Sequence, residues 1–129
     1  MFHKIMVPVD LDQPDIADRA IEAAKRIATL SPEAQIMIIA IATDPSSPDG
    51  AEEEQRLQAY IDAHRAETAM DGVLTLGGRV PSEIRYAAEE MGVDLIVMAS
   101  HEPRLSDMMF GSRSASVALH TQCSVMVVR

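Results

Sequence analysis

Short apolar runs alternate along the chain with stretches in which apolar residues recur at helical spacing. The runs read as strands buried on both faces. Strands are predicted at residues 4–9, 35–42, 73–76, 94–99 and 124–128. Helices are predicted from about 15 to 30, 51 to about 70, 81 to about 91 and 111 to about 121. This alternation predicts an α/β fold, a doubly wound five-stranded parallel sheet with helices on both faces.

Charge and proline mark the ends of the predicted helices. Asp15 and Asp18 lie near the positive end of the first helix dipole, and Lys25 and Arg26 lie near its negative end. Pro81 stands at the predicted first position of a helix, where proline is favoured. These positions support the helix boundaries.

The strand order follows from the handedness of the connections. Right-handed crossovers let the first three strands wind one way before the chain crosses back, which predicts the order 3-2-1-4-5. Ligands of such sheets bind beyond the carboxyl ends of the strands, where the winding reverses. That reversal is expected to bring residues 8–10 next to residues 98–101.

Composition limits the class of protein. The chain has 129 residues, of which 47% are hydrophobic and 3% aromatic, as expected for one domain over residues 1–129 with an aliphatic core. Eleven Lys and Arg against twenty Asp and Glu give a net charge of −9, which argues against a nucleic-acid surface.

The compartment is predicted from cysteine usage and hydropathy. A single cysteine, Cys123, suits a reducing compartment. The chain shows no basic leader with an apolar stretch and no apolar run approaching about 20 residues. We therefore expect a cytoplasmic protein without a membrane partner.

The charge is unevenly distributed along the chain. Residues 1–100 hold eight Lys and Arg and eighteen Asp and Glu, a net charge of −10, whereas residues 101–129 have a net charge of +1. The second segment contains Gly111-Ser112, where a helix start could hold a phosphate through backbone N–H groups. Gly111-Ser112 could equally serve only as a helix cap.

Three segments together carry a family pattern. They are Ile-Met-Val-Pro-Val-Asp at 5–10, Asp-Leu-Ile-Val-Met-Ala-Ser-His at 94–101, and the stretch from Gly111-Ser112 to the end at 129. The chain resembles the universal stress protein family over its whole length, and residues 99–104 are similar to its ATP-binding F/G-type subclass. The resemblance implies a regulatory ligand in stress response, ATP or a related adenine nucleotide (ADP or AMP). It also implies a homodimer that pairs through the last strand, Ser124 to Arg129.

The resemblance implies roles for individual residues. Asp10 occupies the position whose carboxylate accepts from the ribose, and Ile41 the position whose backbone meets the adenine edge. Met98 and Ala99 match positions that line the base and first phosphate. Gly111, Ser112 and Arg113 match the terminal phosphate-binding turn. The winding reversal adds its neighbouring residues, and Arg104 is added as a cation that could offset the charge of Glu102. The full set of expected nucleotide contacts is Pro8, Val9, Asp10, Ile41, Met98, Ala99, Ser100, His101, Arg104, Gly111, Ser112 and Arg113.

The nucleotide motif departs from the family pattern, Gly-x2-Gly-x9-Gly-Ser/Thr. Ala99 and Glu102 stand at the first two glycines, and the interval to Gly111 is one residue short. A carboxylate at Glu102 repels phosphate unless it points outward or shares a metal ion such as Mg²⁺ or Mn²⁺. These departures favour an alternative, a homodimeric stress-related interaction protein that has lost nucleotide binding.

Enzyme chemistry is not indicated. The four histidines show no metal-ligand spacing, there is no Cys-x2-Cys, and neither a nucleophile elbow nor a P-loop occurs. No residue is predicted to be catalytic or to ligate a protein-bound metal. Any ATP hydrolysis is therefore expected to be slow.

Overall fold

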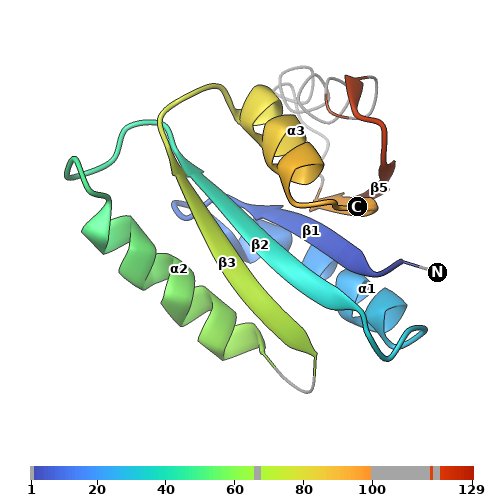
Figure 1. The fold of residues 1–129 in the computed structure, drawn as a ribbon. Helices are drawn as coiled ribbons and strands as arrows, with labels where there is room; N and C mark the ends of the chain where they lie inside the picture. Colours follow the sequence, from blue (N-terminus) through green and yellow to red (C-terminus); the bar gives the residue numbers. More distant parts are fainter. Residues whose placement is uncertain (1, 66–67, 100–116, 118–119) are drawn as a thin grey trace.

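The computed structural model (Figure 1) describes residues 2–65, 68–99, 117 and 120–129. The strands are β1 (Lys4–Val9), β2 (Gln35–Ala42), β3 (Ala69–Leu76), β4 (Leu95–Ala99) and β5 (Ser124–Val128). The helices are the short 3-10 helix η1 (Pro14–Ala17), α1 (Asp18–Ala28), α2 (Ala51–His64) and α3 (Val80–Glu90). The five strands form one parallel sheet in the order β3-β2-β1-β4-β5, which confirms the predicted fold and strand order.

Helices cover both faces of the sheet, because successive strand side chains point to opposite sides. Ile5 and Val7 of β1 belong to the core beneath α1 and α2, whereas Met6 belongs to the core beneath α3. Val117, which is helical and fully buried, joins the α3 side. Of the rest of the predicted helix 111–121, only His120, which is also helical, and Thr121, which is not, belong to the described residues.

The boundary between α2 and β3 differs from the sequence prediction. The helix ends at His64 rather than near residue 70, and the strand begins at Ala69 rather than 73. Asp-Gly at 71–72 is typical of a turn, but Gly72 lies inside the strand beneath α2. A Cβ on Gly72 would lie 3.2 Å from Leu57 Cδ2 and closer still to Ile61. The glycine therefore lets α2 approach the strand backbone.

The start of the first helix also differs from the prediction. Residues 14–17 form a 3-10 helix with a proline in its first turn, and the α-helix begins only at Asp18. It ends at Ala28, two residues earlier than predicted. No helix in the described part of the chain is both long and apolar enough to cross a membrane.

Asp94 joins the amino ends of β1 and β4. Its carboxylate accepts from the backbone N–H of His3 (2.9 Å) and of Lys4 (3.1 Å), and its own N–H donates to the Lys4 carbonyl (3.0 Å). Both backbone groups of Lys4 thus point toward β4. Along a parallel strand this direction alternates, so Met6 and Pro8 also present their backbone groups toward β4.

Pro8 ends the pairing of β1 with β4, because proline has no N–H to donate on that side. The register of β1 with β4 consists of two residue pairs, Ile5 with Leu95 and Met6 with Ile96. On the other side, β1 pairs with β2 along its whole length, from Lys4 to Val9. The carboxyl ends of β1 and β4 are therefore not joined by ladder hydrogen bonds.

Asp94→Ala should lower the free energy of unfolding by about 1–3 kcal/mol, because two backbone N–H groups lose their acceptor. Asp94→Asn keeps one oxygen acceptor and should cost less. Urea unfolding of both variants beside the unsubstituted chain measures the difference. Equal stability of the unsubstituted chain and Asp94→Ala would contradict this role.

Candidate functional site

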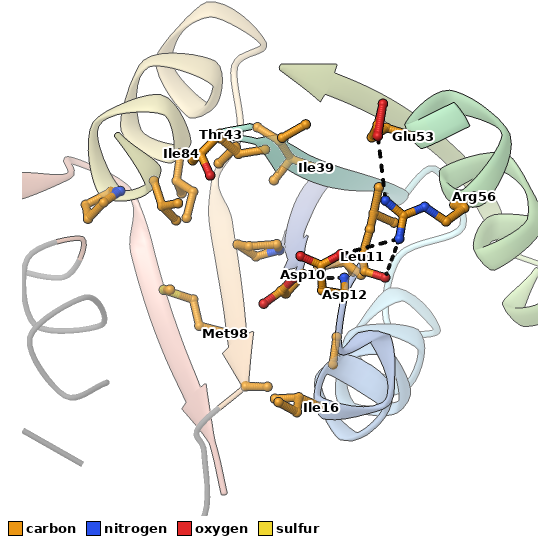
Figure 2. A pocket seen from close by; sticks show the side chains of 18 of the residues that line it. Asp10, Leu11, Asp12, Ile16, Ile39, Thr43, Glu53, Arg56, Ile84 and Met98 are labelled. Atoms are coloured by element: carbon orange, nitrogen blue, oxygen red, sulfur yellow. Dashed lines mark hydrogen bonds and ion pairs between the residues drawn. The ribbon is translucent and has the colours of Figure 1, made fainter. Parts of the chain in front are cut away.

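A cavity of about 300 Å³ opens at the carboxyl ends of β1, β2 and β4 (Figure 2). Its volume is at the lower end of the range for small-molecule sites, about 300–1,000 Å³. The described lining residues come from these strand ends and from η1, α2, α3 and Val117. They are Pro8, Val9, Asp10, Leu11, Asp12, Ile16, Ala17, Ile39, Ile41, Ala42, Thr43, Asp44, Glu53, Arg56, Val80, Pro81, Ile84, Met98, Ala99 and Val117.

Half of the residues expected from the sequence line this cavity. These are Pro8, Val9, Asp10, Ile41, Met98 and Ala99. The segments 8–10 and 98–99 meet here, as the predicted winding reversal requires. The other six lie outside the described residues, namely Ser100, His101, Arg104, Gly111, Ser112 and Arg113. The roles of all twelve in binding stay predictions.

One wall of the cavity is aliphatic. Ile39, Ile84 and Met98 are buried there on the α3 side of the sheet, and Val9 is buried at the cavity on the α1 side. Ile39 and Ile84 were not expected from the sequence, because their place in the cavity depends on where α3 packs. A flat apolar group such as a purine ring can be buried against side chains of this kind.

Asp10 follows β1 and is held in a tight turn at the cavity edge (Figure 2). Its Oδ1 accepts from the Asp12 N–H at 2.9 Å, and its carbonyl accepts from the Gln13 N–H at 3.1 Å. Within the described part of the chain, its second carboxylate oxygen has no hydrogen-bond partner. The side chain is exposed, so that oxygen can accept from a ligand.

The backbone carbonyl of Ile41 is also left without a ladder partner in β1. Gln35 N–H donates to the His3 carbonyl, so the backbone groups of Gln35, and by alternation those of Ile41, point toward β1. The β1–β2 register ends at Val9 and Ala40, one pair before Ile41. The Ile41 carbonyl therefore receives no ladder hydrogen bond from β1 at the cavity mouth.

Arg56 is the one cation among the described lining residues, and the sequence reading did not single it out. Its Nη1 donates to the Leu11 carbonyl (3.3 Å) and to Asp12 Oδ1 (3.4 Å), and its Nη2 lies 3.7 Å from Glu53 Oε2. These contacts join α2 to the turn after β1 (Figure 2). In the sequence, Arg56 is one charged residue among many on a charged helix, so no local pattern distinguishes it.

Glu53 fastens the loop that follows β2. Although it is a carboxylate, the residue is only 4% exposed. Its side chain accepts from the Ser46 N–H (3.2 Å) and the Ser46 hydroxyl (2.9 Å). These hydrogen bonds, with a smaller contribution from Arg56, hold the pKa of Glu53 below its ordinary value. The loop begins at Thr43 and Asp44, which line the cavity.

Two further residues of α2 contact the start of α1. The Tyr60 hydroxyl donates to Asp18 Oδ1 at 3.1 Å, and His64 Nε2 lies 3.2 Å from the same oxygen. Burial raises the pKa of Tyr60, and the Asp18 carboxylate raises it further, so the hydroxyl stays a donor. Arg56, Tyr60 and His64 are spaced four residues apart, which places them on one helix face toward the β1–α1 connection.

The charged side chains of the cavity determine which ligand groups it favours. Within the ranges that the structure describes, no three His, Cys, Asp or Glu side chains gather as a metal site. Among the described residues, the charged groups of the lining are four carboxylates, from Asp10, Asp12, Asp44 and Glu53, and the Arg56 guanidinium. This arrangement can accept hydrogen bonds from a polar ligand.

Glu53→Gln should destabilise the protein near neutral pH, because an amide accepts less well from Ser46 than a carboxylate. The folded-state pKa of Glu53 is lowered, so its contribution is present above the ordinary value of 4.5 and is lost as pH falls through the folded value. The stability difference from the unsubstituted chain should therefore shrink below about pH 4.5 in urea unfolding. Glu54→Gln removes the same charge from the same turn and is the matched control. Identical pH profiles for the two variants would show that the Ser46 contacts contribute nothing.

The chain matches the universal stress protein family over residues 1–129. Universal stress protein G of Shigella flexneri is 28% identical over 142 residues, with 100% of both chains covered.

Two similar solved structures are universal stress proteins. One is in complex with cAMP and has 24% identity, a TM-score of 0.76, and coverage of 99% of this chain and 97% of that chain. The other, from Archaeoglobus fulgidus, is in complex with dAMP and has 20% identity, a TM-score of 0.76, and coverage of 99% and 98%. At these identities the structures support the fold alone. With the family match over all its residues, the chain belongs to the universal stress protein family.

Proposed function

We propose that this protein binds an adenine nucleotide (ATP, ADP or AMP) in the cavity as a regulatory ligand in stress response. The observation that carries the proposal is the Asp10 carboxylate, which has one oxygen held by its own turn and the other available at the cavity edge. A ribose hydroxyl is a suitable donor to such an oxygen, and a hydrogen bond to a charged group contributes about 1.5–3 kcal/mol.

The rest of the cavity fits the other parts of such a ligand. The aliphatic side chains of Val9, Ile41 and Met98 in the lining can cover a purine ring. The Ile41 carbonyl, left without a β1 partner, can accept from the exocyclic amine of adenine. Two relatives of the same fold were solved with cAMP and dAMP, which carry the same adenine base on a ribose and a deoxyribose, respectively.

The phosphate end is assigned from the sequence. Four carboxylates in the described lining disfavour phosphates beside them. The Gly111-Ser112 turn and Arg113 belong to the least acidic segment of the chain, and we propose that the phosphates extend there, with Mg²⁺ or Mn²⁺ as counter-ion. Regulation requires no hydrolysis, and any ATPase activity of the protein is proposed to be slow.

Dimerisation is a second part of the proposal. β5 forms one edge of the sheet, and its Met126 and Val127 side chains are 39% and 43% exposed. An exposed apolar edge strand favours pairing with another chain. We propose a cytoplasmic homodimer through Ser124 to Arg129.

The alternative is a homodimeric interaction protein without nucleotide binding. Ala99 and Glu102 at the family's glycine positions favour this alternative, and so does the acidic cavity lining. It differs from the main proposal in one measurable property, the occupancy of the cavity by a nucleotide.

Mass spectrometry of ligand released from protein purified without added nucleotide, followed by ATP titration with and without Mg²⁺, tests the proposal. We expect an adenine nucleotide and saturable binding. No bound nucleotide and no saturable binding in either condition would favour the alternative.

Asp10→Asn should weaken nucleotide binding about 10- to 150-fold, which corresponds to about 1.5–3 kcal/mol. Asp44→Asn removes the same charge from the same cavity and is the matched control. Calorimetric titration of both variants gives the affinities. Equal effects of the two substitutions would indicate that charge alone, and not a ribose contact at Asp10, governs binding.

A further inference from the structure

We infer that Arg56 is a positioning residue for ribose recognition, because it fixes the turn that presents Asp10 to the cavity. The inference rests on the proposed nucleotide site and adds a residue to it. Neither the family pattern nor the sequence analysis includes Arg56.

A continuous set of contacts leads from α2 to the Asp10 carboxylate. Arg56 Nη1 donates to the Leu11 carbonyl at 3.3 Å and to Asp12 Oδ1 at 3.4 Å. Asp12 in turn donates its N–H to Asp10 Oδ1 at 2.9 Å. The two residues that Arg56 holds are therefore those that complete the Asp10 turn (Figure 2).

The guanidinium is itself oriented from the other side. Nη2 lies 3.7 Å from Glu53 Oε2, and Glu53 is buried and bonded to Ser46. A planar group with donors on two nitrogens can contact Glu53 and the turn at the same time, which a single ammonium does less well. Arg56 thus connects the loop after β2 with the turn after β1.

The contribution of Arg56 to overall stability should be small. Its side chain is 41% exposed, and ion pairs open to solvent contribute little to folding stability. A loss of the contacts should leave the fold intact while the Asp10 turn samples other conformations. The effect should therefore appear in ligand affinity, and only for ligands that use Asp10.

A direct contact between Arg56 and a phosphate is the competing interpretation. The guanidinium already faces three acceptors, Leu11 O, Asp12 and Glu53, and a phosphate would have to displace them or share their donors. The carboxylates of Asp12 and Glu53 would also repel the phosphate. Positioning therefore agrees better with the geometry than phosphate binding.

The test compares two ligands that differ only at the ribose, AMP and 2′,3′-dideoxy-AMP, by calorimetric titration. Arg56→Met should weaken AMP binding about five- to tenfold and change 2′,3′-dideoxy-AMP binding less than twofold. In an Asp10→Asn background, Arg56→Met should have no further effect on AMP. Arg26→Met, which removes an exposed charge from α1 away from the cavity, is the control and should leave both affinities unchanged.

Three results would overturn the inference. Equal weakening of both ligands would indicate a general charge or folding effect, and additive losses in the double variant would separate Arg56 from Asp10. A loss that grows from AMP to ATP would assign Arg56 to the phosphates. In all three cases the unsubstituted chain still binds AMP, so the proposed function stands. Failure of the unsubstituted chain to bind AMP or ATP would instead refute the proposed function together with this inference.

Discussion

The structure depends on the unequal hydrogen bonding of β1 on its two sides. β1 pairs with β2 along its full length, but with β4 only at its amino end, where Asp94 joins the two strands. Pro8 removes the next donor on the β4 side. Because the sheet also reverses its winding direction at this strand pair, the unpaired carboxyl ends open toward solvent and border the cavity. The missing N–H of Pro8 and the reversal of winding therefore both place the entrance for a ligand between the carboxyl ends of β1 and β4.

The acidic lining favours one orientation of the proposed ligand in the cavity. Carboxylates such as Asp10 and Asp44 accept from the hydroxyl and amine groups of a nucleoside and repel its phosphates. A nucleotide in this cavity would be oriented with its donor groups against the described wall and its phosphates toward the less acidic segment 101–129. A negatively charged chain can bind this anionic ligand if its nucleoside end lies at the acidic wall and its phosphate end lies at the less acidic segment.

Much of the fold and part of the site could be predicted from sequence, for identifiable reasons. Apolar runs and helical periods determine the element order, and the handedness of crossovers brings Asp10 near Met98 although they are far apart in the chain. Arg56 could not be predicted, because its acceptors belong to a turn that only the packing of α2 brings close. The start of β3 was predicted at residue 73 instead of Ala69 for a similar reason. The Asp-Gly pair at 71–72 favours a turn locally, whereas the place of Gly72 inside the strand depends on the helix above it.

The close packing of α2 on Gly72 also connects β3, at the far edge of the sheet, to the cavity. Ile61 contacts the position where a Cβ on residue 72 would stand, and Arg56 lies five residues earlier on the same helix, about 7.5 Å along its axis. A helix moves largely as a rigid rod over such a length. Added volume beneath α2 would therefore shift the guanidinium as well as the local packing. Gly72 lies in β3, a strand that does not border the cavity. The small size of this residue nevertheless determines how accurately α2 can hold the Asp10 turn.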